Sequence, residues 1–475
     1  MPFAFAPHNL IVLAVLGLSA FLYLIMQQPK HAFKLGWAFG FGWFGFGGWW
    51  LADTFQTYGH LPYIVGLFVV VLFGLIMGSF LAFWAWFAVK LRQKDYELFW
   101  IFPLVGVLEE WLRSFLFTGL PWAALGNLLL ETPASSWISI FGNYGATLIL
   151  LLAVSSLVFL VTTKHRKLAT LGLTICLLAL IFSPRIEVPN KPTHQAALIQ
   201  PNTAQDQKWD AAFAQNIMFG LAKLSAQAGD VDIIVWPEAA VPMYLSHAPN
   251  WNAWLTKQIN TWHAPVIFGG IKLIDNHNRT PKKSQSVLFL AQQGETARPF
   301  VGKHHLVPFG EYVPAWMPWL SKLVPDIGDF EQATDNGILT VGEQKFGSLI
   351  CYESIFSDEA AARVEQGANV IIVATNDAWY GKSPATWQHT QAAQVRAIET
   401  GRYVLRAANT GISAIISPDG KIQKSMPWWQ DGIVLGRYQP LTHITLYQQW
   451  GNIPVLILVF LGLGFGLVQR YRGKR

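Results

Sequence analysis

Hydrophobic positions form long, nearly uncharged runs at both ends of the chain and much shorter runs between them. Six long runs precede residue 185 and a seventh lies near the C-terminus. Nearly all are long enough to cross a hydrocarbon core as a helix, which takes ~20 residues. They cover residues 10–26, 33–52, 62–89, 98–116, 136–163, 168–183 and 453–469. The pattern predicts a multi-pass α-helical membrane domain with six helices, followed much later by one more.

Between 194 and 440 the hydrophobic runs have the length of strands, are rich in Val and Ile, and are bounded by Gly, Pro, Asn or Asp. The predicted strands are 196–200, 232–236, 265–270, 286–291, 347–351 and 369–375, with helices at about 209–228, 356–366 and 386–400. Residues 404–422 contain "PDG" and read as two strands joined by a turn. Alternating helices and apolar strands predict an α/β domain whose sheet is covered on both faces.

Composition supports this division of the chain. Charged residues make up 13% of the chain, against roughly 25% in an ordinary soluble domain. Of the 28 acidic residues, 21 fall between 191 and 450. We therefore predict a transmembrane domain at 1–190, a soluble-like domain at 191–450, and a transmembrane helix with a basic tail at 451–475.

The positive charges alternate from loop to loop. Twelve Lys and Arg residues follow the first, third and fifth runs or end the chain, whereas the loops "DTFQTYGHL" and "FTGLPWAALGNLLLETPASS" have none. The positive-inside rule then places the N-terminus and the 191–450 domain outside, and the C-terminus in the cytoplasm. Topology thus accounts for the net charge of +6, and no nucleic-acid partner is expected. In a bacterium the domain would be periplasmic.

Only two cysteines occur, Cys176 in the sixth run and Cys351 in the soluble-like domain. A disulfide between them is not expected, because they lie in different domains. A free thiol in an oxidising compartment calls for a chemical explanation. The alternative is a buried core cysteine, which is a common environment for this residue.

Three residues with complementary chemistry follow apolar strands. Glu238 ends "DIIVWPE", Cys351 ends "FGSLIC", and Lys303 lies in "RPFVGKHHLVPFGEYVP". The carboxyl ends of strands are where active sites form in α/β sheets. A carboxylate can deprotonate a thiol, and an ammonium can stabilise the thiolate and a later oxyanion. Taken singly, "WPE" could also be a strand followed by a turn, and Lys303 could also be an ordinary surface lysine. No Cys/His cluster suggests a metal, and no cofactor is expected.

The order Glu238, Lys303, Cys351 resembles the nitrilase superfamily, whose fold is an α-β-β-α sandwich. Longer motifs resemble the apolipoprotein N-acyltransferase family over nearly the whole chain. They are "EWLRSFLFTGLPWAALG" (110–126), "QDQKWD" (205–210), "VWPEAAVP" (235–242), "KHHLVPFGEYVP" (303–314), "ICYES" (350–354), "TNDAWYGKSPATWQH" (375–389) and "RAIETGRYVLRAANTGISA" (396–414). One departure is that six hydrophobic segments precede the domain where the family has seven.

The resemblance implies a bacterial inner-membrane enzyme that moves an acyl chain from a phospholipid, of the phosphatidylethanolamine class, to the N-terminal amine of a diacylated apolipoprotein. Cys351 would be the nucleophile that carries the chain as a thioester, Glu238 the general base and Lys303 the oxyanion partner. The positions that match supporting residues of the family are Glu311, Tyr352, Glu353, Trp209 and Trp379. The tryptophans also fit simple packing, and Glu353 a structural ion pair. A monomer is expected.

Other features and rival functions remain open. Residues 312–330 read as an apolar arm that dips into the membrane interface, or as an ordinary lid. Glu110 and Arg113 lie one turn apart in the fourth run and either neutralise each other or contact a headgroup. A membrane-tethered amidase acting on a small amide could use the same three residues. A transporter with an external binding domain is disfavoured, because the chain shows no hydrophobic repeat.

Overall fold

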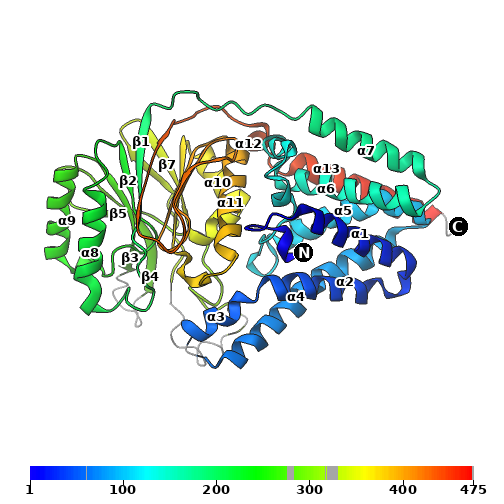
Figure 1. Ribbon diagram of the computed structural model, residues 1–475, viewed down its shortest axis with the longest axis horizontal. Helices are drawn as coiled ribbons and strands as arrows, with labels where there is room; N and C mark the ends of the chain where they lie inside the picture. Colours follow the sequence, from blue (N-terminus) through cyan, green and yellow to red (C-terminus); the bar gives the residue numbers. More distant parts are fainter. Residues whose placement is uncertain (60, 275–282, 316, 318–329, 473–475) are drawn as a thin grey trace. The chain divides into compact units, whose positions relative to one another are not determined.

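The computed structural model describes residues 1–59, 61–274, 283–315, 317 and 330–472, and the chain divides into two units. The helical unit comprises 1–186, 382–391 and 445–475, and the sheet unit comprises 187–381 and 392–444. The two units are coloured along the chain in Figure 1.

Every predicted apolar run contains a helix. The helices of the helical unit outside 382–391 are α1 Ile11–Gln27, α2 Ala32–Gly40, α3 Trp50–Thr57, α4 Tyr63–Leu91, α5 Leu98–Arg113, α6 Ile138–Thr162, α7 Arg166–Ile181, α12 Leu446–Trp450 and α13 Ile453–Arg472. The prediction of one helix over 33–52 is wrong. Helix α2 ends at Gly40, a π-helical turn follows at Phe41–Gly45, and α3 begins only at Trp50.

Three described helices are long and apolar enough to cross a membrane: Tyr63–Leu91, Pro133–Thr162 (α6 with its preceding 3-10 turn) and Ile453–Arg472. The segments Ile11–Gln27 and Pro29–Gly45, bent by 111°, together make a fourth if counted as one span. Helices α5 and α7 have 16 residues each, fewer than the ~20 of a full crossing. Seven separate spans therefore stay a prediction.

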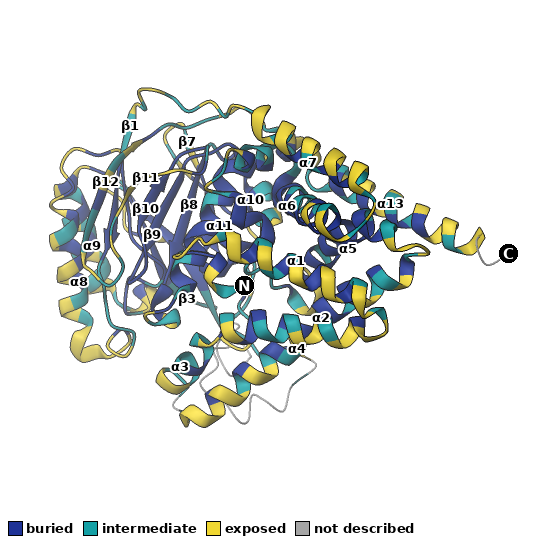
Figure 2. Cartoon of the chain, turned by 45° about the vertical axis from the view of Figure 1, so that its right-hand side comes forward, coloured by how far each residue is buried: buried dark blue, intermediate teal, exposed yellow. Residues whose placement is uncertain are grey.

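The outer surfaces of these helices suit a lipid environment. Large apolar side chains are exposed along α4 and α13, among them Ile64, Phe68 and Leu461, and Figure 2 shows exposed positions along both helices. The glycines of the second run allow close packing between helices. A Cβ added at Gly36 would lie 2.4 Å from the carbonyl oxygen of Leu81 on α4.

The charged residues of α5 are buried and paired. Arg113 Nε lies 3.2 Å from Glu109 Oε1, and Arg113 Nη2 lies 3.6 Å from Glu110 Oε1. Glu110 also accepts hydrogen bonds from the Leu125 amide (2.6 Å) and the Thr147 hydroxyl (2.7 Å). Neutralisation inside the protein, the simpler of the two interpretations, is what the structure shows.

The sheet unit contains two six-stranded mixed sheets among its described residues, with strand orders β12-β1-β2-β3-β4-β5 and β11-β10-β9-β8-β7-β6. In the first, β1 His194–Gln200, β2 Ile233–Val235 and β3 Val266–Ile274 are parallel to one another. In the second, β7 Gln344–Ile350, β8 Val370–Thr375 and β9 Val404–Ala408 are parallel. The remaining pairs are antiparallel, so the two sheets have the same pattern of directions.

The two sheets share one interior. Buried apolar residues from both sheets, such as Leu198, Val235, Phe346 and Ile372, form a single cluster. A second cluster joins the other face of the first sheet to α8 Ala211–Ser225 and α9 Pro249–Trp262, and the outer layers are visible in Figure 1. Helix α10 Ser357–Glu365 lies on the second sheet, where Arg363 Nε donates to the Ser348 carbonyl (3.0 Å). The predicted α-β-β-α sandwich is confirmed.

The six predicted strands before residue 380 all exist, and the "PDG" turn joins β10 Ala414–Ile416 to β11 Ile422–Ser425. The segment 404–422 was predicted to hold two strands, but β9 precedes β10, so residues 404–425 hold three. Further elements were not predicted. They are β5 Arg298–Gly302, β6 Ile338–Val341, β12 Gly432–Tyr438 and α9. Strand β4 Lys283–Ala291 also begins three residues before the predicted strand at 286–291. Helix α11 extends over Ala385–Thr400, close to the predicted 386–400.

Candidate active site

Three strands of the sheet unit end next to the three residues with complementary chemistry. Glu238 follows β2 by three residues, Lys303 directly follows β5, and Cys351 directly follows β7. Strands β2, β3 and β5 run in the same direction, because β4 is antiparallel to both β3 and β5. Glu238 and Lys303 therefore emerge at the same edge of the first sheet, as expected for a site at the carboxyl ends of strands.

The ammonium of Lys303 lies between two carboxylates. Its Nζ is 2.6 Å from Glu311 Oε1 and 3.4 Å from Glu238 Oε1. Burial alone would lower the pKa of Lys303, but Glu311, Glu238 and Cys351 outweigh it and hold that pKa well above its ordinary value. Lys303 thus keeps its positive charge although it is buried. The other oxygen of Glu238 accepts a hydrogen bond from the amide of Asn376 (3.0 Å).

Cys351 occupies a strained turn. Its φ of +54° is in the left-handed region, which residues other than glycine rarely adopt and which is common at functional sites. Burial and then the charge of Glu238 raise the pKa of the thiol, although Lys303 and a hydrogen bond with Thr375 oppose the shift. Burial thus favours the neutral thiol, and the charge of Lys303 opposes this shift without reversing it.

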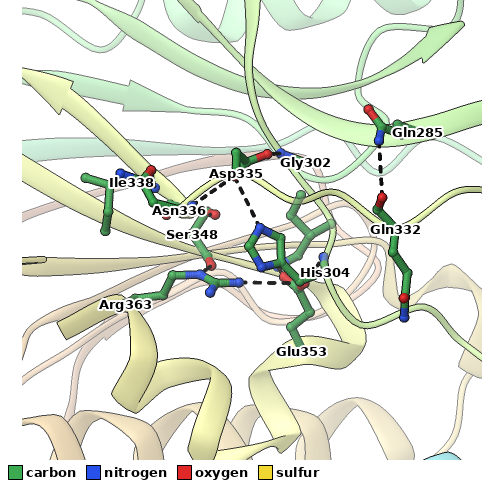
Figure 3. Close-up of polar contacts among 12 residues, drawn as sticks. Gln285, Gly302, His304, Gln332, Asp335, Asn336, Ile338, Ser348, Glu353 and Arg363 are labelled. Atoms are coloured by element: carbon green, nitrogen blue, oxygen red, sulfur yellow. Dashed lines mark hydrogen bonds and ion pairs between the residues drawn. The ribbon is translucent and has the colours of Figure 1, made fainter. Parts of the chain in front are cut away.

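Glu353 connects the turn of Cys351 to the segment that carries Lys303. Its Oε2 accepts from the Ile350 amide (2.6 Å), and its Oε1 accepts from the amides of His304 (2.5 Å) and His305 (3.0 Å). The side chain is fully buried, and burial is the main reason that its pKa rises to about 7. Arg363 is 4.0 Å away (Figure 3). The ion pair with Arg363 is therefore the longest of these contacts, and the hydrogen bonds from the backbone amides are the closer ones.

Asp335 contacts the residues on both sides of Lys303, the backbone of Gly302 and the imidazole of His304. Its carboxylate accepts from the Gly302 amide (2.8 Å) and contacts His304 Nε2 (3.2 Å), as Figure 3 shows. The amide of Lys303 donates to Ser286 (2.9 Å), and the carbonyl of Lys303 accepts from Ala333 (2.9 Å). Little freedom remains for the backbone that carries the ammonium.

Family models match both parts of the chain. The description "carbon-nitrogen hydrolase" applies to residues 195–442, and "apolipoprotein N-acyltransferase N-terminal domain" to residues 1–158. An apolipoprotein N-acyltransferase of Coxiella burnetii is 32% identical over 98% of this chain and 97% of its own length. This chain belongs to the apolipoprotein N-acyltransferase family. The relative from Haemophilus ducreyi is 31% identical over 99% of this chain and 95% of its own.

Among solved structures, an amidase of the nitrilase superfamily from Nesterenkonia is similar, at 16% sequence identity and a TM-score of 0.42. The match covers 57% of this chain and 98% of the amidase. Independently of that match, the family model over residues 195–442 and the two-sheet architecture confirm the resemblance to the nitrilase superfamily inferred from the motifs.

Sequence reasoning missed several residues of this acyltransferase that belong to the cluster around Glu238, Lys303 and Cys351. Lys208 is buried, its Nζ donates to the Glu238 carbonyl (3.1 Å), and its charge interacts with Cys351. Burial lowers the pKa of Lys208 to about 8, although Glu238 and Cys351 raise it. Thr375 donates to Asp377 (2.8 Å), which pairs with buried Arg406 (2.6 Å). A signal was available for Asp377, because "TND" follows an apolar strand, but nothing in the local sequence marks Lys208 as buried.

The remaining predicted residues lie around this cluster with different exposure. Tyr352 is buried next to Cys351, and burial raises the pKa of its hydroxyl. Trp209 and Trp379 are exposed side chains next to Lys208 and Tyr380. The predicted arm at 312–330 lies mostly outside the described residues. Within the described residues, no group of three or more His, Cys, Asp or Glu could hold a metal ion.

Proposed function

We propose that this protein of the bacterial inner membrane transfers an acyl chain from a phospholipid of the phosphatidylethanolamine class to the N-terminal amine of a diacylated apolipoprotein. Family membership over nearly the full chain supports acylation of a lipoprotein amine. The observation that carries the mechanism is the contact of Glu238 and Lys303 beside the strained Cys351.

In the first half-reaction Cys351 Sγ attacks the ester carbonyl of the phospholipid. The thiol proton moves to Glu238 as the S–C bond forms, because the raised pKa of the thiol leaves it neutral beforehand. Lys303, which keeps its charge, stabilises the oxyanion that develops on the carbonyl oxygen. The ester C–O bond then breaks, Glu238 returns the proton to the glycerol oxygen, and a lysophospholipid leaves.

In the second half-reaction the lipoprotein amine attacks the thioester on Cys351. Glu238 accepts the amine proton as the C–N bond forms, and the thiolate leaves and takes that proton. A covalent intermediate between two separate substrates implies ping-pong kinetics. Glu311, hydrogen-bonded to Lys303 Nζ and to the Val307 amide (2.8 Å), holds the ammonium in place.

Hydrolysis of a small amide by the same residues, the alternative drawn from the sequence, would use water in the second step. The match of residues 1–158 to the N-terminal domain of the acyltransferases favours the lipid reaction. The two reactions differ in what discharges the acyl-enzyme, and one experiment can follow both.

Intact-mass analysis after incubation with phosphatidylethanolamine tests the mechanism. One acyl adduct on Cys351 is expected, discharged by a diacylated lipopeptide faster than by water. Cys351→Ala, Glu238→Gln and Lys303→Ala should carry no adduct, whereas Cys176→Ala should be acylated normally. An adduct that persists in Cys351→Ala, or one that water discharges as fast as the lipopeptide, contradicts the proposal.

A further inference from the structure

A basic pocket of about 260 Å³ lies in the helical unit, where the ends of three elements meet. It is formed by the short turn η2 Pro29–His31 with the first residues of α2, the C-terminal end of α4 with Arg92, and Arg470 in the last turn of α13. Its walls include the basic residues Lys30, Lys90, Arg92 and Arg470 and the aromatic residues Phe33 and Trp86. The active-site cluster contributes none of these residues.

The positive charge of this pocket is only partly balanced. Arg92 Nη1 lies 2.7 Å from Asp95 Oδ1, a side chain that is 79% exposed. The contact is close but poorly directed, since this buried nitrogen has no hydrogen-bond acceptor among the described residues. Lys30, Lys90 and Arg470 form no ion pair within the described part of the chain. Several cations around one hollow therefore remain available to an anion.

Two general effects explain part of this arrangement. The C-termini of α4 and α13 carry partial negative charge and favour nearby cations, and basic residues are common on the cytoplasmic side of membrane helices. Neither effect requires the cations of three separate elements to line one pocket with two aromatic side chains. That convergence is the feature a ligand would explain.

The chemistry of the lining suits a phosphate held at a membrane surface. Arginine presents parallel N–H groups that match phosphate oxygens, and basic pockets between membrane helices on the cytoplasmic side bind anionic headgroups. Trp86 is half-exposed, as tryptophans at membrane interfaces are. The volume is below the roughly 300–1,000 Å³ of pockets for drug-sized ligands, so it suits a headgroup rather than a whole lipid.

We propose that this pocket binds the headgroup phosphate of an anionic phospholipid. The acyl chains would lie along exposed apolar side chains of α13, such as Leu467 and Val468. On the orientation that the positive-inside rule predicts, the bound lipid belongs to the cytoplasmic leaflet. The site is independent of acyl transfer, and the failure of either proposal leaves the other intact.

Native mass spectrometry of the full chain, released from bilayers that contain phosphatidylglycerol, tests this site. The triple variant Lys90→Gln, Arg92→Gln, Arg470→Gln should retain the lipid on the order of 100-fold more weakly, since each cation near an anionic lipid contributes about fivefold. The matched control Lys34→Gln, Lys94→Gln, Arg472→Gln removes three charges from the same predicted side but outside the pocket, and it should retain the lipid as the unaltered protein does.

Two further arms complete the experiment. Arg470→Gln alone should lose part of the binding, so the test survives if the triple variant does not fold. Excess inorganic phosphate or glycerol 3-phosphate should not displace the lipid, because neither has acyl chains to contact the helices. Equal retention by the pocket and control variants would overturn the site. Full displacement by free phosphate would overturn the lipid as its ligand.

Discussion

At the scale of single residues, Glu353 is the connection between nucleophile and ammonium. It receives three backbone N–H groups, one from the end of β7 and two from the residues after Lys303. A carboxylate can accept all three, whereas an amide presents one acceptor oxygen and an NH₂ group. The charge of Glu353 therefore matters less than its two acceptor oxygens.

Glu353→Gln should lower the rate at which Cys351 is acylated by roughly 10- to 100-fold, because an unsatisfied buried donor costs about 1–3 kcal/mol. The substituted NH₂ group would face an N–H donor and shift either Cys351 or Lys303. The measurement is the single-turnover acylation rate by intact mass. Glu359→Gln is the matched control, since Glu359 also pairs with Arg363 (3.0 Å) but accepts no bond from the turn of Cys351 in the described contacts. Equal rates in both variants would refute the role.

Lys208 gives the site a pH dependence with a defined sign. Its pKa is about 8 in the folded protein and 10.5 for an ordinary lysine, and burial is the main cause of the difference. Between these values the unfolded chain binds more protons than the folded one, so stability rises with pH there. Below pH 8 the cost of burying the charged lysine is present in full.

The effect of Lys208→Met on stability should therefore depend on pH between about 8 and 10.5. As pH rises from 8 towards 10, the thermal unfolding midpoint of the unaltered protein should rise relative to that of Lys208→Met. The measurement is the difference between the two midpoints at each pH. Lys223→Met, which removes an exposed lysine on α8, is the control for the loss of a lysine as such. A difference for Lys208→Met that varies with pH no more than that for Lys223→Met would contradict the shifted pKa.

At the scale of elements, strand β3 supports the turn that carries Glu238. The Gly269 amide donates to the Pro237 carbonyl (3.1 Å), and the Gly269 carbonyl accepts from the Ala240 amide (2.9 Å). A Cβ on Gly269 would lie 2.5 Å from the Ala239 amide nitrogen and 2.6 Å from the Glu238 Cα. These contacts are with backbone, so the turn itself would have to move.

Gly269→Ala should consequently reduce acylation of Cys351 by about tenfold or more, because small displacements of a catalytic group from its working geometry cost on the order of 100-fold at 1 Å. The measurement is the same single-turnover rate, with the unfolding midpoint recorded in parallel. Gly220→Ala on α8, where nothing lies within 4 Å of the added Cβ, should leave the rate unchanged. A normal rate in Gly269→Ala would mean that the turn tolerates the shift.

The same elements show how far the sequence could predict the structure. Strands β1, β2, β7 and β8 are buried on both faces, and their continuous apolar runs identified them. Strand β5 is "RPFVG", with its first three residues exposed, so its pairing with β4 rather than its own pattern makes it a strand.

The site shows the same limit. The positions of Glu238, Lys303 and Cys351 at strand ends were predictable, because strand direction and polar residues are both readable. The contribution of Lys208 was not, since a lysine in a turn is ordinarily solvated. Its burial under Glu238 depends on contacts between segments 30 residues apart.

At the scale of the whole molecule, the distribution of charge predicts the orientation of the membrane helices. Basic residues follow α1, α4 and α6 and end α13, while the loops after α3 and α5 have none. In a background of Cys176→Ala and Cys351→Ala, Gln56→Cys should react with a membrane-impermeant maleimide in intact spheroplasts. Lys164→Cys is equally exposed in the structure, yet it should react only after the membrane is permeabilised. Reaction of Lys164→Cys from outside would reverse the orientation, and with it both the periplasmic location of Cys351 and the leaflet assigned to the lipid at Arg470.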